Sequence, residues 1–214
     1  MTTQATTLDQ LKQELGAALP PLDDDDRRSA RTLVRLLAQG DPVEPERFAP
    51  ALGRSTPDAA KAIAGLPLVI RDDAERVVGF WGLSVVEMPH RLRADGRNLY
   101  TWCAWDTLFL PVALGEQVGV ESTCPTTAQP ITLTVSPEGV SDVHPSGAVM
   151  SFLLSGEEGF SGDVIRGFCH FVHFFASEDA ARTWTAEREG TFQLSITDGF
   201  DLGRFWATRA FGSP

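Results

Sequence analysis

A change of residue pattern near residue 65 is the feature that most constrains the fold of this chain. Before it, apolar residues recur at helical spacing and aromatic residues are few, whereas nearly all of the Trp and Phe lie beyond it. Leu8, Leu11, Leu15 and Leu19 repeat every three or four residues, which is typical of a helix with one apolar face. The pattern predicts a helical N-terminal part followed by a part of another class.

Three further helices are expected before residue 65. Residues 27–39 carry an apolar stripe and are followed by Gly40, a common residue after a helix end. Residues 45–52 form a short helix, and Thr56-Pro57-Asp58 opens another through Ile63, since proline is well tolerated in a first turn. The acidic run at residues 23–26 is interpreted as a solvated linker or a helix start.

A β-hairpin is predicted directly after these helices. Residues 66–70 and 77–86 are rich in β-formers, and the polar residues 71–76 between them indicate a turn. Because helices followed by a hairpin are the order of a winged helix-turn-helix, residues 1–86 are predicted to form a winged-helix-like domain. Its recognition helix would hold one lysine and no arginine, so a scaffold role is favoured over DNA binding.

Residues 87–214 are predicted to form an α+β domain, with a mixed, mainly antiparallel sheet and flanking helices. Asp95-Gly96 indicates a hairpin between two short strands. The apolar segment 102–114 is expected to be a helix that ends at Gly115. Strands are further expected at residues 118–122, 131–135, 140–144, 148–154, 168–176 and 192–196, and helices at 177–189 and 200–211.

Composition limits the classes of function. The net charge of −11 argues against a general nucleic-acid binder, since affinity for phosphates comes largely from Lys and Arg. No stretch approaches the roughly 20 apolar residues of a membrane span, and the first residues lack the pattern of an export signal. Three cysteines are a poor disulfide framework. We therefore expect a cytoplasmic protein that binds neither nucleic acid nor membranes.

Two cysteine-containing segments are candidates for chemistry. Cys103 and Asp106 lie three residues apart, so in a helix they would project side by side, and the dipole at its N-terminus would lower the pKa of the thiol. Cys169 is expected at the start of an apolar strand among phenylalanines. A Cys-x-x-Asp turn together with a distant cysteine in aromatic surroundings indicates chemistry more strongly than a single cysteine does, although the pattern alone is weak evidence.

Three segments together resemble one known family. They are LYTWCAWDTLFLPVALG, then TCPTT with PITLTVSPEGV, then FCHFVHFFASEDAARTW, and they are similar in order and spacing to the alkylmercury (organomercurial) lyases. The resemblance runs from about Asn98 to the C-terminus and includes all three cysteines. The N-terminal half matches more loosely, but that family also begins with a winged-helix-like segment. In some relatives a second cysteine follows the one at Cys169, whereas here His170 does.

The resemblance implies a lyase that cleaves the carbon–mercury bond of R–Hg⁺ to give R–H and Hg²⁺. Cys103 and Cys169 fall on the two catalytic cysteines and Asp106 on the catalytic aspartate, and these three would also hold the Hg²⁺ product. Cys124 falls on a cysteine with a structural role. No cofactor is expected. The substrate would be a small organomercurial, and low-molecular-weight thiols or a mercuric reductase would accept the released Hg²⁺.

Elementary chemistry supports this interpretation. Mercury is soft and thiophilic, so thiolates are its preferred ligands. A second thiolate adds electron density to mercury and makes the bound carbon more basic, and a carboxyl group can then move a thiol proton to that carbon. We expect Cys103 to attack first, Cys169 to complete the dithiolate, and Asp106 to carry the proton.

Three other functions fit parts of the pattern. A thiolate-based Zn, Cu or Hg protein, metal-binding or metal-sensing and without lyase activity, could use Cys103, Asp106, Cys169 and His173, although the usual paired Cys-x-x-Cys is lacking. A cysteine hydrolase would leave one cysteine unexplained. A winged-helix DNA-binding sensor is disfavoured by the acidic charge. Cys124 and His173 are expected to be buried structural residues, and the two tryptophans beside Cys103 to belong to the core.

Overall fold

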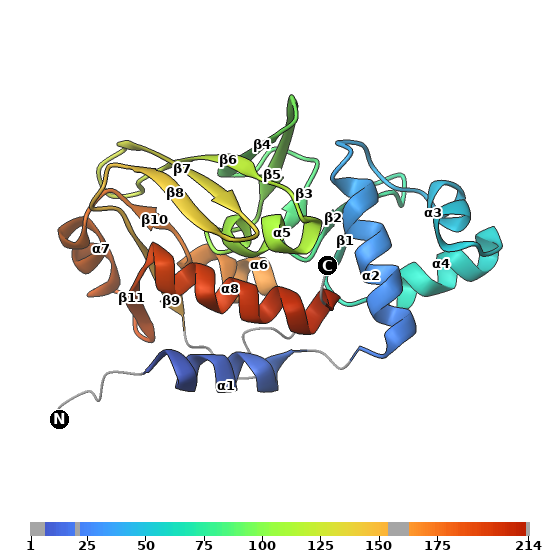
Figure 1. Cartoon of the computed structure of the whole chain (residues 1–214), viewed down its shortest axis with the longest axis horizontal. Coiled ribbons are helices and arrows are strands. Elements are labelled where there is room, and N and C mark those ends of the chain that lie inside the picture. Colours follow the sequence, from blue (N-terminus) through green and yellow to red (C-terminus); the bar gives the residue numbers. More distant parts are fainter. Residues whose placement is uncertain (1–6, 20–21, 154–162, 213–214) are drawn as a thin grey trace.

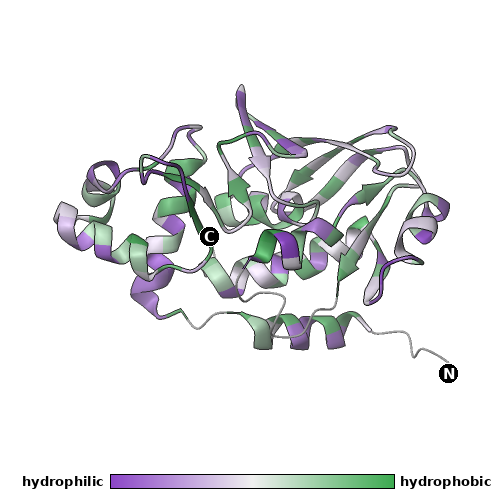
Figure 2. Ribbon diagram, turned by 180° about the vertical axis from the view of Figure 1, so that it is seen from behind, coloured by the Kyte–Doolittle hydropathy of each residue, from purple (hydrophilic) through white to green (hydrophobic). Residues whose placement is uncertain are grey.

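The computed structural model describes residues 7–19, 22–153 and 163–212 and has the α+β class expected from the sequence. Within these ranges lie eight α-helices, a sheet of eight strands and a smaller sheet of three. The helices α2 to α4 form one end of the molecule, and both sheets with the later helices form the other (Figure 1). Figure 2 shows hydrophobic residues gathered on the central elements and hydrophilic ones on outer turns. No described helix has the length and hydrophobicity needed to cross a membrane.

Four helices make up the N-terminal part. They are α1 (Leu8–Ala18), α2 (Asp24–Leu37), α3 (Pro45–Leu52) and α4 (Thr56–Gly65). The acidic run is a helix start, because the Asp23 carboxylate accepts hydrogen bonds from the backbone N–H groups of Asp25 and Asp26, at 2.9 and 2.8 Å. Helix α1 packs on the C-terminal helix α8 (Ile196–Phe211), and its Leu11 and Leu15 are buried. The four predicted helices are thus confirmed.

The main sheet has the strand order β1-β2-β3-β5-β4-β6-β7-β8, and all of its described pairs are antiparallel. Its strands are β1 (Val69–Arg71), β2 (Val77–Phe80), β3 (Leu83–Ser84), β4 (His90–Ala94), β5 (Arg97–Thr101), β6 (Val118–Thr123), β7 (Pro130–Ser136) and β8 (Gly139–His144). The single strand expected over residues 77–86 is wrong. Trp81 and Gly82 have positive φ angles and form a tight turn between β2 and β3.

Strands from both sides of residue 86 belong to this one sheet, because β3 pairs with β5. Helices α2 to α4 followed by the hairpin of β1 and β2 keep the order that a winged-helix-like segment requires. The winged-helix assignment and the division into residues 1–86 and 87–214 remain predictions.

Helix α5 (Asp106–Leu114) lies inside the molecule. All nine of its residues are buried, and it packs against α8 and β7. The predicted helix over 102–114 therefore begins four residues too early. Glycines of α8 allow close approach of the two helices, since a Cβ atom on Gly203 would lie 3.1 Å from the Cβ of Phe109. This close packing fixes the element that carries Asp106.

The small sheet has the order β10-β9-β11 and supports the second cysteine segment. Its elements are β9 (Val149–Leu153), β10 (Phe174–Phe175) and β11 (Thr191–Ser195), with α6 (Val164–Gly167) and α7 (Glu178–Thr185) beside them. The strand expected over 168–176 is wrong except at β10, because Cys169–Phe171 form a 3₁₀ helix. Leu154, the last residue of the strand expected at 148–154, lies outside the described residues.

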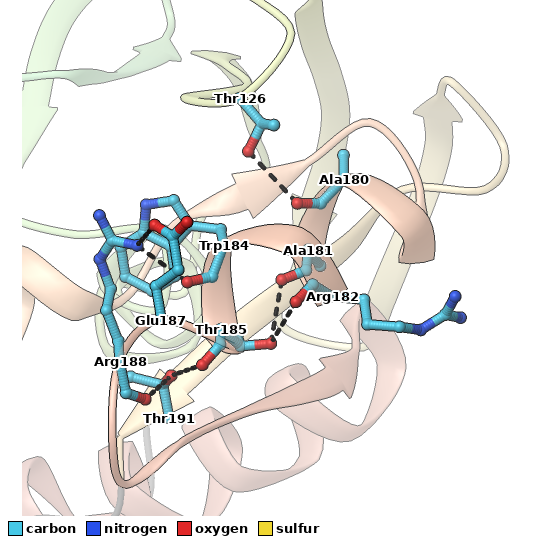
Figure 3. Close-up of polar contacts among 9 residues, drawn as sticks. All are labelled: Thr126, Ala180, Ala181, Arg182, Trp184, Thr185, Glu187, Arg188 and Thr191. Carbon is cyan, nitrogen blue, oxygen red and sulfur yellow. Dashed lines mark hydrogen bonds and ion pairs between the residues drawn. The ribbon is translucent and has the colours of Figure 1, made fainter.

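Side-chain contacts stabilise both ends of helix α7 (Figure 3). At its start, the Thr126 hydroxyl in the loop after β6 donates a hydrogen bond to the Ala180 carbonyl at 3.2 Å. Beyond its end, the Arg188 guanidinium lies 4.0 Å from the centre of the Trp184 ring, and the Thr191 hydroxyl donates to the Arg188 carbonyl at 2.6 Å. The helix expected through residue 189 thus ends at Thr185, where a tight loop leads into β11.

Candidate active site

Three residues predicted from two distant segments meet in one buried group. Asp106 is the first residue of α5, Cys103 lies in the turn before it, and Cys169 opens the 3₁₀ helix after α6. Both Sγ atoms and a carboxylate oxygen of Asp106 lie within 4.8 Å of one another. Cys103, Asp106 and Cys169 are 0%, 5% and 4% exposed. The cluster that the sequence could only suggest is therefore present.

The turn before α5 places Cys103 and Asp106 side by side. The Asp106 carboxylate accepts a hydrogen bond from the backbone N–H of Cys103 at 2.7 Å. The Thr101 hydroxyl donates to the Cys103 carbonyl at 2.9 Å, and the backbone N–H of Trp102 donates to the Gly82 carbonyl at 3.0 Å. Cys103 thus lies outside the helix, and the expectation that both residues project from one helical face is wrong. Their proximity comes from the hydrogen-bonded turn.

Short backbone contacts hold the Cys169 segment against this turn. The N–H of Ala104 donates to the carbonyl of Val172 at 3.1 Å. The Ser151 hydroxyl of β9 donates to the Phe171 carbonyl at 2.8 Å and accepts from the N–H of His173 at 3.0 Å. These bonds replace the ladder of an extended strand at residues 169–173. They also fix Cys169 beside Cys103.

A small aromatic cavity opens onto the cluster. Its volume is about 20 Å³, roughly the space of one water molecule. Its lining comprises Leu68, Trp81, Gly82, Trp102, Trp105, Asp106, Phe109, Val164, Phe168, Cys169 and Trp206. Asp106 and Cys169 thus line the cavity, whereas the fully buried Cys103 does not. A larger hollow of about 430 Å³ around Arg91 and Tyr100 is lined by no cysteine.

Burial controls the ionisation of the carboxyl group. It raises the pKa of Asp106 to about 7, against hydrogen bonds from the backbone and side chain of Cys103 and the backbone of Trp102 that lower it. A carboxyl group with such a pKa can both accept and release a proton near neutral pH.

The thiols are also harder to ionise than free cysteine. Burial, followed by the hydrogen bond to Cys169, raises the pKa of Cys103 well above its usual value. The hydrogen bond from Cys103 lowers the pKa of Cys169, but burial and the charges of Asp106 and Asp163 outweigh it, so the net shift is upward. The expected lowering of the Cys103 pKa by a helix dipole is wrong, because full burial beside a carboxylate opposes the thiolate.

His173 and Cys124 lie outside the group that could hold a metal ion. The His173 ring pairs with the His170 carbonyl at 2.8 Å and packs against Trp184, and burial lowers its pKa. Cys124 is buried, and its pKa is lowered because hydrogen bonds from Thr127 and nearby backbone outweigh the effect of burial. The four-ligand set with His173 therefore does not assemble among the described residues.

Several cavity residues were not predicted from the sequence. Leu68, Trp81, Gly82, Val164 and Trp206 come from four other segments, so no local spacing connects them with the cysteines. The Trp-Gly pair inside a β-rich run was a usable signal, since glycine within a strand pattern often marks a turn or a close backbone approach. Trp102 and Trp105, expected in the core, are buried and line the cavity.

Comparison with known proteins decides the family. The model of the alkylmercury lyase family matches residues 83–208. The alkylmercury lyase of Bacillus cereus is 39% identical over 179 residues, which cover 84% of this chain and 80% of that protein. The chain belongs to the alkylmercury lyase family. That of Staphylococcus epidermidis is 40% identical over 179 residues, with 84% and 81% covered. That of Streptomyces lividans is 39% identical over 174 residues, with 81% and 79% covered.

A solved structure supports the fold of this family member. The crystal structure of the mercury-bound form of MerB2 superposes with a TM-score of 0.77, covering 94% of this chain and 98% of that one, at 24% identity. The family match begins upstream of residue 98, where the resemblance in the sequence began, and the curated relatives extend over most of the chain. The predictions of an alkylmercury lyase and of an enzyme are confirmed.

Proposed function

We propose that this chain cleaves the carbon–mercury bond of small organomercurials by protonolysis at Cys103, Cys169 and Asp106. The observation that carries the proposal is the meeting of two thiols and one carboxyl group, within 4.8 Å of one another, beside an aromatic cavity. Mercury prefers sulfur ligands, and the aromatic wall suits an apolar organic group. The name shared by the curated relatives supports the same activity.

The reaction balances with these three side chains alone. R–Hg⁺ replaces the proton of one thiol, and that proton leaves the site. The second thiol transfers its proton to the Asp106 carboxylate, and its sulfur binds mercury. Asp106 then protonates the carbon as the Hg–C bond breaks, which releases R–H and leaves Hg²⁺ on two thiolates with Asp106 beside it.

The cavity geometry favours Cys169 as the first thiol, in place of the Cys103 expected from the sequence. Cys169 lines the cavity, whereas Cys103 is fully buried and is not part of the lining. The hydrogen bond between the two thiols raises the pKa of Cys103 and lowers that of Cys169, which favours the thiolate at Cys169 over that at Cys103. Cys103 also lies in the same turn as Asp106, so its proton has the shorter route to the carboxylate.

No cofactor enters this scheme. External low-molecular-weight thiols, or a mercuric reductase, would remove the Hg²⁺ product by thiol exchange. The three cysteines are free thiols, which fits a reducing compartment such as the cytoplasm. Neither nucleic acid nor a membrane has a part in the proposed reaction.

The first test is incubation with phenylmercury and excess thiol, with benzene measured by gas chromatography. Wild type should release benzene, and Cys103→Ser and Cys169→Ser should release none above the uncatalysed rate. Cys124→Ser is the matched control and should retain turnover, since Cys124 lies outside the group.

Asp106→Ala should bind mercury yet cleave roughly 100-fold more slowly, which is a usual rate contribution of a general acid–base group. Substantial turnover by either active-site serine variant would overturn the assignment.

Two further measurements separate the finer alternatives. Intact-mass spectrometry should show a phenylmercury adduct forming on Cys103→Ser at the native rate and far more slowly on Cys169→Ser; the reverse order would restore Cys103 as the first thiol. A protein that binds Zn, Cu or Hg at the same group but releases no hydrocarbon would be a metal-binding or sensing protein. Metal analysis of protein purified without added mercury distinguishes that outcome.

A further inference from the structure

The turn between β2 and β3 has an unusual backbone. Phe80 pairs with Leu83, so only Trp81 and Gly82 connect the strands. Their φ angles are +45° and +87°, as in the two-residue turns that normally hold asparagine and glycine. A tryptophan in the left-handed region costs free energy and persists only where its surroundings hold it.

Trp81 anchors this turn to the wall of the cavity. Its indole N–H donates to the Pro67 carbonyl at 3.1 Å, and its backbone N–H donates to Leu68 at 3.3 Å. Its ring packs against Trp206 and Phe211 of α8, with centroid distances of 5.8 and 5.2 Å. The position of Gly82 is therefore set by contacts outside the thiol cluster.

Gly82 lies directly against the carboxyl group of Asp106. A Cβ atom on Gly82 would overlap the carboxyl carbon and one oxygen of Asp106 and would lie 2.8 Å from its Cβ. The Gly82 carbonyl also accepts the backbone N–H of Trp102 at 3.0 Å. Gly82 thus contacts both the residue before Cys103 and the side chain of Asp106, at the two ends of one short turn.

We propose that Gly82 is a positioning residue for the Asp106 carboxyl group. Its carbonyl binds the start of the turn that carries Cys103, and its lack of a side chain leaves the space in which the carboxyl group lies beside the two thiols. This inference rests on the proposed function, in which Asp106 moves the proton. A side chain at residue 82 would push the carboxyl group away from Cys103, while both sulfurs would remain available to mercury. Mercury binding and proton transfer should therefore separate.

The test compares Gly82→Ala with Gly96→Ala. Gly96, in the turn between β4 and β5, also has a positive φ, +77°, but a Cβ atom there would have no neighbour within 4 Å. Both variants place an alanine at a positive φ angle, and only Gly82→Ala meets Asp106. In a single turnover of bound phenylmercury, Gly82→Ala should release benzene about 100-fold more slowly, as a misplacement of about 1 Å allows. It should still bind one mercury per chain. Gly96→Ala should match wild type.

A double-mutant cycle with Asp106→Gly makes the result specific, because glycine removes both the carboxyl group and the Cβ atom that Gly82→Ala would meet. Once the carboxyl group is absent, Gly82→Ala has nothing to displace, so it should not slow the reaction further, and its loss of thermal stability should shrink. Equal rates for Gly82→Ala and Gly96→Ala would overturn the proposal, as would a Gly82→Ala effect that is unchanged without Asp106. If Gly82→Ala alone fails to fold, recovery of folding in the double variant supports the contact and continued failure rejects it. If wild type released no benzene, the proposed function would fail, yet the stability coupling would still decide the contact.

Discussion

Asp106 shows how burial adapts one residue to a task. An exposed aspartate would be ionised throughout the physiological range. Enclosed among aromatic side chains, Asp106 has a pKa of about 7, even though Cys103 and Trp102 donate hydrogen bonds to its carboxylate. The carboxyl group is therefore balanced between its two protonation states, as a proton carrier between sulfur and carbon requires.

The pH profile of cleavage should report this balance. The proposed cycle begins with an Asp106 carboxylate that accepts a thiol proton, so protonation of Asp106 removes the active form. We expect kcat/KM for phenylmercury to fall as the pH decreases through about 7, approaching about tenfold per pH unit below it. The measurement is benzene release at fixed concentrations of external thiolate.

Asp106→Asn is the control for that profile, because the amide keeps the size of the side chain but cannot accept the proton. Its residual activity should lack the acidic limb. A wild-type profile that stays flat through neutral pH would contradict the role of Asp106 in the proton transfer.

Helix α5 illustrates what packing adds at the scale of an element. With nine buried residues it has no polar face, so neither its start nor its orientation could be read from amphipathic spacing. Its place is set by α8, where Gly199 and Gly203 allow the helices to approach. A Cβ atom on Gly199 would lie 3.1 Å from Cδ1 of Leu108, and one on Gly203 would lie 3.3 Å from the backbone nitrogen of Phe109.

Gly203→Ala should consequently destabilise the protein. We expect a loss of about 1–3 kcal/mol in the free energy of unfolding, as for other overpacked cores. Gly65→Ala, at the exposed end of α4 with nothing within 4 Å, is the helical control and should be neutral or up to about 1 kcal/mol more stable. Urea unfolding measures both. Equal stability of the two variants would show that α5 can shift without cost.

The elements that the sequence predicted are those whose signals are local. The local residues determine the backbone conformation in three such places: Thr56-Pro57-Asp58, the acidic start of α2 and the Asp95-Gly96 hairpin. The wrongly predicted elements lie where a run of apolar residues is equally compatible with a strand, a helix or a turn. The run at 168–176 has β-forming residues, but its carbonyl groups accept hydrogen bonds from the Ser151 hydroxyl and the Ala104 N–H, and residues 169–171 form a 3₁₀ helix.

At the scale of the whole molecule, the site depends on contacts that sequence spacing cannot supply. Cys103 and Asp106 could be paired from their separation, but Cys169 joined them only through the family resemblance. Gly82 and Trp206 lie in other elements, and only the assembled sheet and α8 bring them to the cavity. The two cysteines and the aspartate were therefore predictable from the sequence, whereas the residues that line the cavity beside them were not.

The aromatic residues around the cavity also make mercury binding detectable by intrinsic tryptophan fluorescence. Four of the five tryptophans, Trp81, Trp102, Trp105 and Trp206, line the cavity, and only Trp184 lies elsewhere. A heavy atom close to an indole ring promotes intersystem crossing by spin–orbit coupling, so mercury held at the thiols should quench most of the intrinsic emission. Titration with Hg²⁺ should show this quenching in wild type and in Trp184→Phe, and lose it in a Cys103→Ser, Cys169→Ser double variant. Emission unchanged by one equivalent of Hg²⁺ would place the metal away from the cavity. The protein thus carries its own fluorescent indicator of mercury loading and release, with no added label.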